Sequence, residues 1–227
     1  NCGSSSLKYQ LINMDTEEVI AKGLCERIGI DGSKLTHQAT GKDKHIIENP
    51  MQSHNEAIKM VLDALIDSEH GVIKSLDEIH AVGHRVVHGG MKYSESVLVD
   101  ADVKQGIRDC FDLGPLHNPA NLMGIEAVEK VMPGVKNAVV FDTAFGASVP
   151  DKASRYAIPH EYYEKYSIKR YGFHGTSHKF VSGEAIKFGN LDPKTAKVIV
   201  CHLGNGASVS ASIGGKCVDT SMGFTPL

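Results

Sequence analysis

The sequence predicts an α/β fold in which a mixed sheet is flanked by helices. Apolar and polar residues alternate over residues 7–13, which is typical of a strand with one buried face. Apolar residues recur at helical spacing over residues 58–66, as in a helix that packs one stripe against a core. The short apolar run at residues 137–141 indicates a buried strand.

The first elements along the chain form an antiparallel sheet followed by a helix. The alternating strand at residues 7–13 is followed by a turn and by a second run at residues 19–28. Pro50 ends the strand region. Ser53 and Glu56 have the spacing of a capping box, so we expect a helix to begin there.

Buried strands and amphipathic helices then alternate. Residues 79–87 predict a strand interrupted by Gly83, and residues 97–111 predict a strand end that leads through Asp100 into a helix. Pro119 marks the start of a further helix, which ends before Gly134. The strand at residues 137–141 places Asp142 at its carboxyl end, a common position for catalytic groups in α/β sheets.

The last part of the chain is richer in strands. A short aromatic helix is expected at residues 160–166, and a longer helix is expected to run from residue 175 to Phe188. Strands are predicted at residues 197–202, 207–213 and 217–221, joined by turns at residues 203–206 and 214–215.

Composition excludes several classes of protein. The 227 residues are 41% hydrophobic and 22% charged, which argues against a disordered or fibrous protein. The formal net charge of −3 gives no reason to expect nucleic acid or anionic lipid as a partner. The apolar runs are far shorter than the ~20 residues of a spanning helix. Five scattered cysteines without a Cys-x-x-Cys pair favour a reduced, cytoplasmic protein.

Both ends of the sequence predict a fragment of a longer protein. The chain begins at Asn1 in a Gly/Ser turn, which normally needs a preceding strand to complete a hairpin. It stops at Leu227, after a glycine- and serine-containing segment, without a closing helix or polar tail.

Two small polar turns each lead into an alternating strand, at residues 1–7 and 203–210. Glycines let a backbone approach a ligand closely, and the amide and hydroxyl groups of such turns form concavities that bind anions. The two turns together are therefore a candidate binding site for a polyphosphate. Either turn alone is more often a structural turn without a ligand. Neither turn is a Walker loop.

Arg85 is a charged residue within an apolar strand, and Asp142 is a charged residue at the end of another. Arg85 lies close in sequence to glycines at residues 89–90, where a small anion has room to approach, and arginine suits bidentate recognition of carboxylate or phosphate. A structural ion pair is the alternative for Arg85. Asp142 is suited to holding magnesium or acting as a base, and a turn or cap role is the alternative.

Histidines mark two helix starts. His174 and His178 lie among glycines and hydroxyl residues at an expected helix start, where developing negative charge is stabilised. Their spacing also suits zinc, but no Glu follows the first histidine and no third ligand is evident. His117 precedes the helix at Pro119, and the alternative to a functional role there is a simple cap.

Six stretches together closely resemble the acetate kinase (acetokinase) family, and in order they span almost the whole chain. They are NCGSSSLKY at residues 1–9, GHRVVHGG at 83–90, LHNPAN at 116–121, FDTAF at 141–145, RYGFHGTSH at 170–178 and HLGNG at 202–206. The resemblance implies the ribonuclease-H-like, actin-like ATPase fold of the sugar kinase, heat-shock chaperone and actin superfamily. It implies a first such domain at residues 1–145 carrying the acetate site and the start of a second, nucleotide-binding domain at 146–227.

The resemblance also implies a reaction, reversible phosphoryl transfer from ATP to acetate that gives acetyl phosphate and ADP with Mg²⁺ or Mn²⁺. Asp142, His174, Arg85 and His117 would be catalytic, with Arg85 holding the acetate carboxylate, Asp142 positioning the metal or the attacking carboxylate, and His174 stabilising the transition state. The phosphates would be held by Lys8, Ser4, Ser6, His202, Leu203, Gly204, Asn205 and Gly206. The acetate pocket would be formed by Arg85, Val87, Leu116, Phe173 and Pro226. The metal ion would be bound by Asn1 and Asp142.

The chain departs from that family in length, because members are nearly twice as long. The remainder would supply a second arginine, the adenosine-binding turns and a metal-binding glutamate, and most of a homodimer interface. One alternative is a propionate or butyrate kinase with the same catalytic set, although Val87 leaves room for little beyond a methyl group. The others are a nucleotide-binding regulatory or structural module, a catalytically dead fragment and a zinc hydrolase.

Overall fold

The structure, a computed structural model, describes residues 1–226. The chain forms two compact units. Unit 1 comprises Asn1–Arg85 and Pro119–Ala138, and unit 2 comprises Val86–Asn118 and Val139–Leu227. Strands β5 (Ala81–Val86) and β7 (Lys136–Phe141) each begin in unit 1 and end in unit 2, so the chain passes between the units within these strands. The division at residue 145 rests on the family resemblance and stays a prediction.

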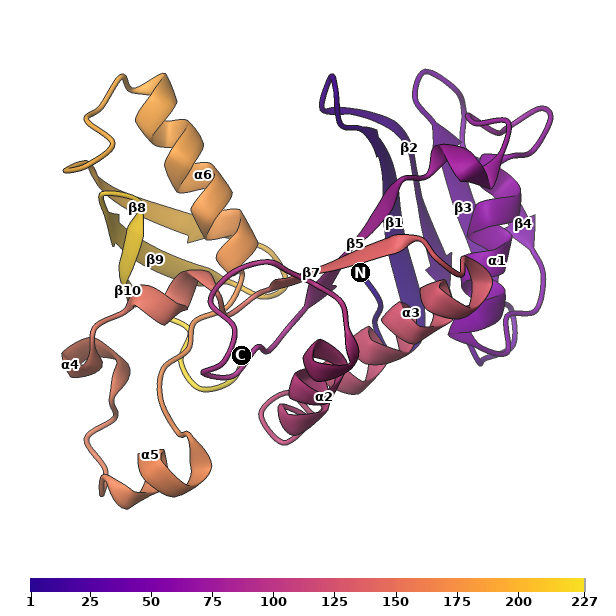
Figure 1. Ribbon diagram of the computed structural model, residues 1–227. Helices are drawn as coiled ribbons and strands as arrows, with labels where there is room; N and C mark the ends of the chain where they lie inside the picture. Colours follow the sequence, from indigo (N-terminus) through magenta and orange to yellow (C-terminus); the bar gives the residue numbers. More distant parts are fainter. Residues whose placement is uncertain (227) are drawn as a thin grey trace. The chain divides into compact units, whose positions relative to one another are not determined.

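Unit 1 is built on a four-stranded antiparallel sheet with the order β1-β2-β3-β4 (Figure 1). Its strands are β1 (Ser6–Asn13), β2 (Glu18–Glu26), β3 (Lys34–Ala39) and β4 (His45–Glu48). Leu7 pairs with Cys25, which pairs in turn with Leu35, and all three side chains are buried. The alternation in residues 7–13 therefore predicted the strand and its buried face, whereas β3 had no separate prediction.

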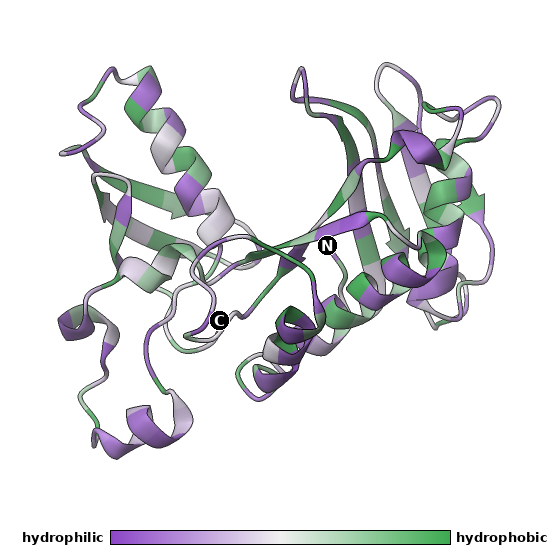
Figure 2. Cartoon of the chain, viewed as in Figure 1, coloured by the Kyte–Doolittle hydropathy of each residue, from purple (hydrophilic) through white to green (hydrophobic). Residues whose placement is uncertain are grey.

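The core of unit 1 lies between this sheet and the helices α1 (His54–Leu65) and α3 (Asn118–Val131). Figure 2 shows apolar and polar residues interspersed along α1 and the strands, and the apolar stripe of α1 (Val61, Leu62, Leu65) joins the core. The capping box predicted at the start of α1 is wrong. Ser53 is the N-cap but makes no side-chain hydrogen bond, and the Glu56 carboxylate accepts from the backbone N–H of Gln52 instead.

A glycine in β2 makes room for an aromatic side chain of β1. A Cβ atom on Gly23 would overlap the ring of Tyr9 and would lie 2.6 Å from the carbonyl oxygen of Thr36. The Tyr9 hydroxyl is hydrogen-bonded to Nδ1 of buried His37, whose Nε2 contacts the carbonyl oxygen of His70 at 3.1 Å. The glycine thus permits a polar link across three strands.

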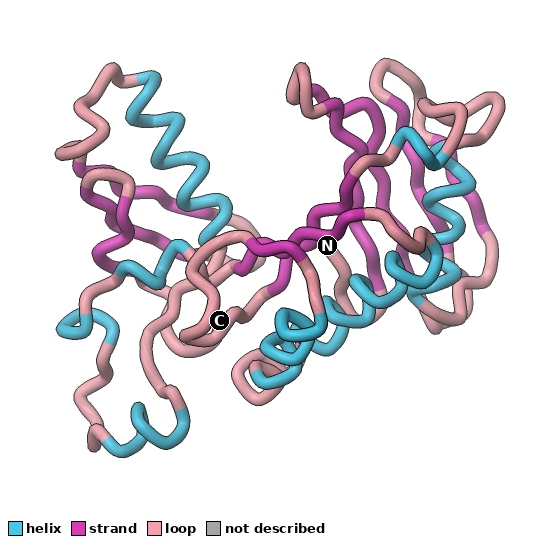
Figure 3. Tube along the Cα trace, in the orientation of Figure 1, coloured by secondary structure: helices cyan, strands magenta, loops and turns pink. Residues whose placement is uncertain are grey.

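Unit 2 contains a three-stranded antiparallel sheet, β10-β9-β8, with helix α6 packed on it (Figure 3). These elements are α6 (Gly175–Phe188), β8 (Lys197–His202), β9 (Ser208–Ile213) and β10 (Lys216–Thr220).

The smaller elements of the chain are η1 (Leu76–Glu78), β6 (Val97–Leu98), α2 (Ala101–Asp109), η2 (Phe145–Ser148), α4 (Asp151–Ser154) and α5 (Glu161–Tyr166).

The α/β class is confirmed, and most predicted elements are present. Asp100 caps α2 as expected, with its carboxylate accepting from the N–H of Val103 at 2.7 Å. The short helices α4 and η2 were not predicted, because four residues carry too little periodicity. A third sheet has the order β5-β7-β6. Within residues 1–226, no helix combines the length and apolarity needed to cross a membrane.

Candidate active site

Asp142 connects the end of a buried strand to the start of a helix in unit 2. It follows β7, and its backbone N–H donates to the carbonyl of Val86 at 2.9 Å. Its side chain is buried, and the carboxylate accepts a hydrogen bond from the backbone N–H of His174 at 2.8 Å, while its carbonyl accepts from Gly175 N–H at 2.9 Å. The predicted carboxylate is therefore buried and directed at the first residues of α6.

The residue before α6 has an uncommon backbone conformation. His174 is the N-cap residue and has left-handed dihedral angles, φ 57° and ψ 27°. Gly175 follows it, and a Cβ atom there would overlap the carbonyl oxygen of Asp142. Since the N-terminus of a helix favours negative charge, this packing places the Asp142 carboxylate in a favourable field.

A cluster of histidines and serine hydroxyls surrounds this helix start. The ring of His174 stacks on that of His202, with centroids 4.1 Å apart, and Nδ1 of His202 contacts the hydroxyl of Ser177 at 2.9 Å. Ser208 contacts both His174 Nδ1 at 2.8 Å and His178 Nε2 at 2.7 Å. Burial lowers the pKa of His178, the nearby imidazoles of His174 and His202 lower it further, and the Asp142 carboxylate raises it.

The turn at residues 203–206 lies beside His174. Leu203, Gly204 and Asn205 are exposed, and His202 and Gly206 are half-buried. A Cβ atom on Gly206 would lie 3.3 Å from Nε2 of His174. The structure thus brings together His174 and the stretch at residues 202–206, two features that the sequence singled out separately.

A small apolar cluster joins two of the predicted pocket residues. Val87 and Phe173 are buried and pack with Met222, which no sequence motif had indicated. The cluster does not include Leu116, which is 79% exposed, or the exposed Pro226. The role of these two residues as pocket walls therefore stays a prediction.

His88 follows Val87 and is fully buried. Its Nδ1 accepts from the N–H of Gly90 at 2.9 Å, so Nε2 carries the hydrogen, and among the described residues this Nε2 has no hydrogen-bond partner. The His88 ring packs against that of Tyr171 in a T-shaped arrangement, with the ring centroids 4.4 Å apart. Burial lowers the pKa of His88 to about 4. The amide of buried Asn118 bonds both the backbone N–H and the carbonyl of His88, at 3.0 and 2.9 Å.

His117 is exposed just before α3, and its backbone N–H donates to the carbonyl of Gly114 at 3.1 Å. This hydrogen bond belongs to the turn that precedes α3. A catalytic role for His117 stays a prediction that rests on the family resemblance.

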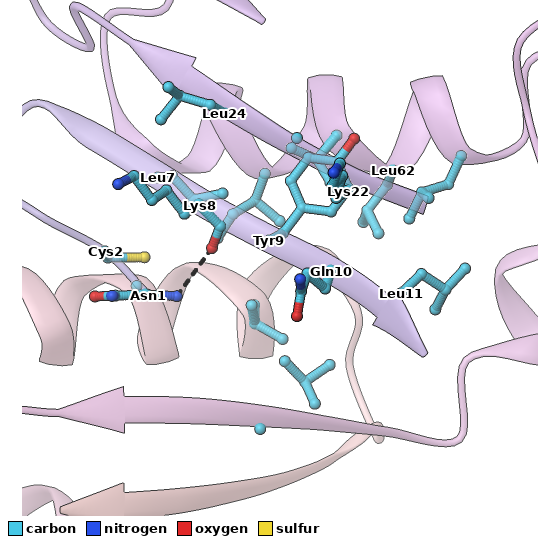
Figure 4. Close-up of a pocket in the computed structure, with 18 of the residues that line it drawn as sticks. Asn1, Cys2, Leu7, Lys8, Tyr9, Gln10, Leu11, Lys22, Leu24 and Leu62 are labelled. Carbon is cyan, nitrogen blue, oxygen red and sulfur yellow. Dashed lines mark hydrogen bonds between the residues drawn. The ribbon is translucent and has the colours of Figure 1, made fainter. Parts of the chain in front are cut away.

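The remaining predicted residues belong to unit 1. The backbone nitrogen of Asn1 donates to the carbonyl of Lys8 at 3.0 Å, and Lys8 N–H donates back to the carbonyl of Asn1 at 3.0 Å (Figure 4). Asn1, Lys8 and Arg85 line a cavity of about 890 Å³. Ser4 is exposed and Ser6 is half-buried, and neither lines this cavity.

The side chains near the start of α6 offer different donor groups to zinc and to magnesium. Residues 1–226 contain no group of three or more His, Cys, Asp or Glu side chains arranged for a metal ion. Serine hydroxyls contact both ring nitrogens of His178, which leaves none for zinc. The buried carboxylate of Asp142 fits magnesium, which is usually bound through one or two carboxylates together with phosphate oxygens and water.

Solved structures confirm the fold. The chain matches the crystal structure of Porphyromonas gingivalis acetate kinase with a TM-score of 0.96 and 46% identity, over 100% of this chain and 57% of that one. It matches a propionate kinase from Francisella tularensis with a TM-score of 0.90 and 44% identity, over 100% and 56% of the two chains. The fold is therefore that of the actin-like phosphotransferases.

The family follows from the sequence matches. The family model described as the Acetokinase family matches residues 1–227, and the chain belongs to this family. It is 63% identical over 227 residues to the acetate kinase of Agathobacter rectalis and 60% identical to that of Thermotoga maritima. The match covers all of this chain, and 57% and 56% of the two relatives. The chain thus spans little more than half the length of these relatives.

Proposed function

We propose that the protein transfers the γ-phosphoryl group of ATP to acetate, reversibly, and forms acetyl phosphate and ADP. The observation that carries the proposal is the arrangement in unit 2, where the buried Asp142 carboxylate bonds the backbone of His174 and the glycine-rich turn lies against the His174 ring. Membership of the Acetokinase family supports it.

In the proposed reaction, a carboxylate oxygen of acetate attacks the γ-phosphorus, and the bond from that phosphorus to the β–γ bridging oxygen breaks. Acetate is already ionised at neutral pH, so no residue has to remove a proton. Catalysis then consists of positioning and charge stabilisation. Asp142 thus has an electrostatic role, and His174 is a hydrogen-bond donor to the transferring group.

The other roles come from the family resemblance. Arg85 would hold the acetate carboxylate, Val87, Phe173, Leu116 and Pro226 would enclose its methyl group, and His117 would assist catalysis. Lys8, Ser4, Ser6 and residues 202–206 would contact the phosphates. Magnesium, held by Asp142 with help from Asn1, would neutralise phosphate charge when bound. We also infer a cytoplasmic homodimer.

A direct assay tests this proposal. The protein is incubated with ATP, Mg²⁺ and acetate, and acetyl phosphate is trapped with hydroxylamine, after the intact mass of the same sample has been measured. We expect turnover that Arg85→Ala abolishes and that Arg27→Ala leaves in place. Arg27 is a matched control because it is an arginine of the same unit whose guanidinium bonds the carbonyl of Asp31. Absence of acetate-dependent turnover in the parent protein would overturn the proposal.

A propionate kinase is the second candidate, because one structural relative carries that description at 44% identity. The same assay with propionate distinguishes the two. An acetate kinase shows the higher kcat/KM with acetate, and a ratio in favour of propionate would select the alternative.

A further inference from the structure

Three consecutive hydrogen bonds join α6 to β9 within unit 2. His174 Nδ1 contacts the Ser208 hydroxyl at 2.8 Å, the same hydroxyl contacts His178 Nε2 at 2.7 Å, and His178 Nδ1 contacts the Ser210 hydroxyl at 2.8 Å. His178, Ser208 and Ser210 are 1%, 2% and 3% exposed. The chain of bonds therefore runs from the half-buried ring of His174 into the interior of the unit.

Counting hydrogens leaves two directions in which the Ser208 hydroxyl donates within this chain. A hydroxyl has one hydrogen to donate, and a neutral imidazole carries a hydrogen on only one ring nitrogen. In one direction Ser210 donates to His178, His178 Nε2–H donates to Ser208, and Ser208 donates to Nδ1 of His174. The hydrogen of His174 then lies on Nε2. In the opposite direction His174 donates from Nδ1, and its Nε2 has a bare lone pair.

The position of Nε2 decides between the two directions. This nitrogen lies beside Gly206, in the turn proposed to hold the phosphates. A bare lone pair there would repel phosphoryl oxygens, whereas an N–H group would donate a hydrogen bond to them. We propose that Ser208, His178 and Ser210 are positioning residues that hold His174 in the Nε2–H tautomer. The inference rests on the proposed function and extends it to residues that touch no substrate.

Strand β9 supplies a matched control for this proposal. Ser208, Ser210 and Ser212 alternate along the strand, and all three are buried. The Ser212 hydroxyl donates to the carbonyl of Val198 at 3.3 Å, outside the chain of bonds that includes the two histidines. Ser212→Ala therefore removes a buried hydroxyl from the same face without interrupting the chain.

Steady-state kinetics provides the first test. We expect Ser208→Ala to lower kcat about tenfold, the scale of one lost hydrogen bond, and to change KM for ATP and acetate by less than about twofold. Ser208→Thr, which keeps a hydroxyl, should restore most of kcat, and Ser212→Ala should match the parent protein. Equal kcat in Ser208→Ala and Ser212→Ala would overturn the proposal, provided that thermal unfolding shows both variants to be folded.

Substitution of His178 separates its two nitrogens. Glutamine places an amide nitrogen near the position of Nε2 and can still donate to Ser208, whereas asparagine is too short to reach it. We expect His178→Gln to retain a higher kcat than His178→Asn. The reverse order would contradict the direction of the chain.

Nuclear magnetic resonance reports the tautomer without any turnover. In protein labelled with ¹⁵N at histidine, His174 should show its hydrogen on Nε2, and Ser208→Ala should increase the population with the hydrogen on Nδ1. A bare Nε2 in the parent protein would overturn the proposal. If the parent fails to phosphorylate acetate, the proposed function fails, while the resonance result still decides the tautomer.

Discussion

The Asp142 carboxylate accepts a hydrogen bond from the backbone N–H of His174 at 2.8 Å, although 32 positions separate the two residues in the sequence. The same aspartate also accepts from Gly175 N–H through its carbonyl oxygen. One residue therefore both secures the start of α6 and supplies a buried negative charge.

Asparagine at position 142 separates these two roles. The side-chain oxygen of Asp142→Asn can still accept from His174 N–H, but the negative charge is lost. We expect acetate phosphorylation to fall by about 10²–10³-fold, the scale of a lost electrostatic group in a catalytic site, with little change in Tm. Asp142→Ala should lower both the activity and Tm. A fully active Asp142→Asn variant would show that the charge is not needed.

Two glycines of α6 should respond oppositely to alanine. Gly175→Ala would drive Cβ into the Asp142 carbonyl oxygen, so we expect it to lower the free energy of unfolding by about 1–3 kcal/mol. At Gly183 a Cβ atom would meet no other atom within 4 Å, and Gly183→Ala should stabilise by about 0.5–1 kcal/mol. Urea unfolding measures the free energy of unfolding of both variants. An unchanged value for Gly175→Ala would show that the backbone can shift to accommodate the methyl group.

Val87 should influence the choice between acetate and propionate. It packs with Phe173 and Met222, and Val87→Ala would open space of the order of a methylene group or more. We expect the ratio of kcat/KM for propionate to that for acetate to rise by roughly tenfold, in keeping with about 1–3 kcal/mol per methylene. Val86→Ala is the control, because Val86 is also buried but is absent from this cluster. An equal shift in both variants would indicate general loosening.

Stability should rise with pH between about 4 and 6.5 because of His88. Burial lowers its pKa to about 4 in the folded state, whereas the unfolded value is near 6.5. In this window the unfolded state binds more protons, so the free energy of unfolding increases with pH by at most ~1.4 kcal/mol per pH unit for this group. Its contribution is fully present above pH 6.5 and is lost as the pH falls to 4.

His88→Leu tests that contribution through the slope of unfolding free energy against pH. The variant should have a shallower slope than the parent, whatever its absolute stability. Burial also lowers the pKa of His37, His84 and His178, so part of the slope remains. His160→Gln, at an exposed position, controls for loss of a histidine. An unchanged slope in His88→Leu would contradict the assignment.

Local patterns predicted most elements because their signals lie within a few residues. Pro119, Gly134 and the apolar spacing between them predicted α3, and Asp100 predicted the start of α2. The prediction of a capping box at Ser53 was wrong because the Glu56 carboxylate accepts a hydrogen bond from the backbone N–H of Gln52 instead. That choice depends on how the chain enters the helix, which side-chain spacing does not encode.

The sequence predicted those site residues that belong to recognisable motifs. It did not predict the residues whose role depends on packing. Motifs pointed to both Asp142 and His174, but their hydrogen bond depends on tertiary structure. Met222 had no local signal, because its role comes from contact with Val87 and Phe173. Ser208 and Ser210 had a local signal that was not used. Hydroxyl residues at the inward positions of a strand indicate a polar partner in the core.

The buried serines of β9 also affect how unit 2 responds to temperature. Hydroxyl groups of β9 and an imidazole of α6 form part of the contact between this strand and this helix. In many domains aliphatic side chains fill the equivalent space. Exposure of polar surface lowers the heat capacity of unfolding, whereas exposure of apolar surface raises it. Calorimetry should therefore find a smaller heat-capacity change for this unit than its size indicates, and a flatter stability curve.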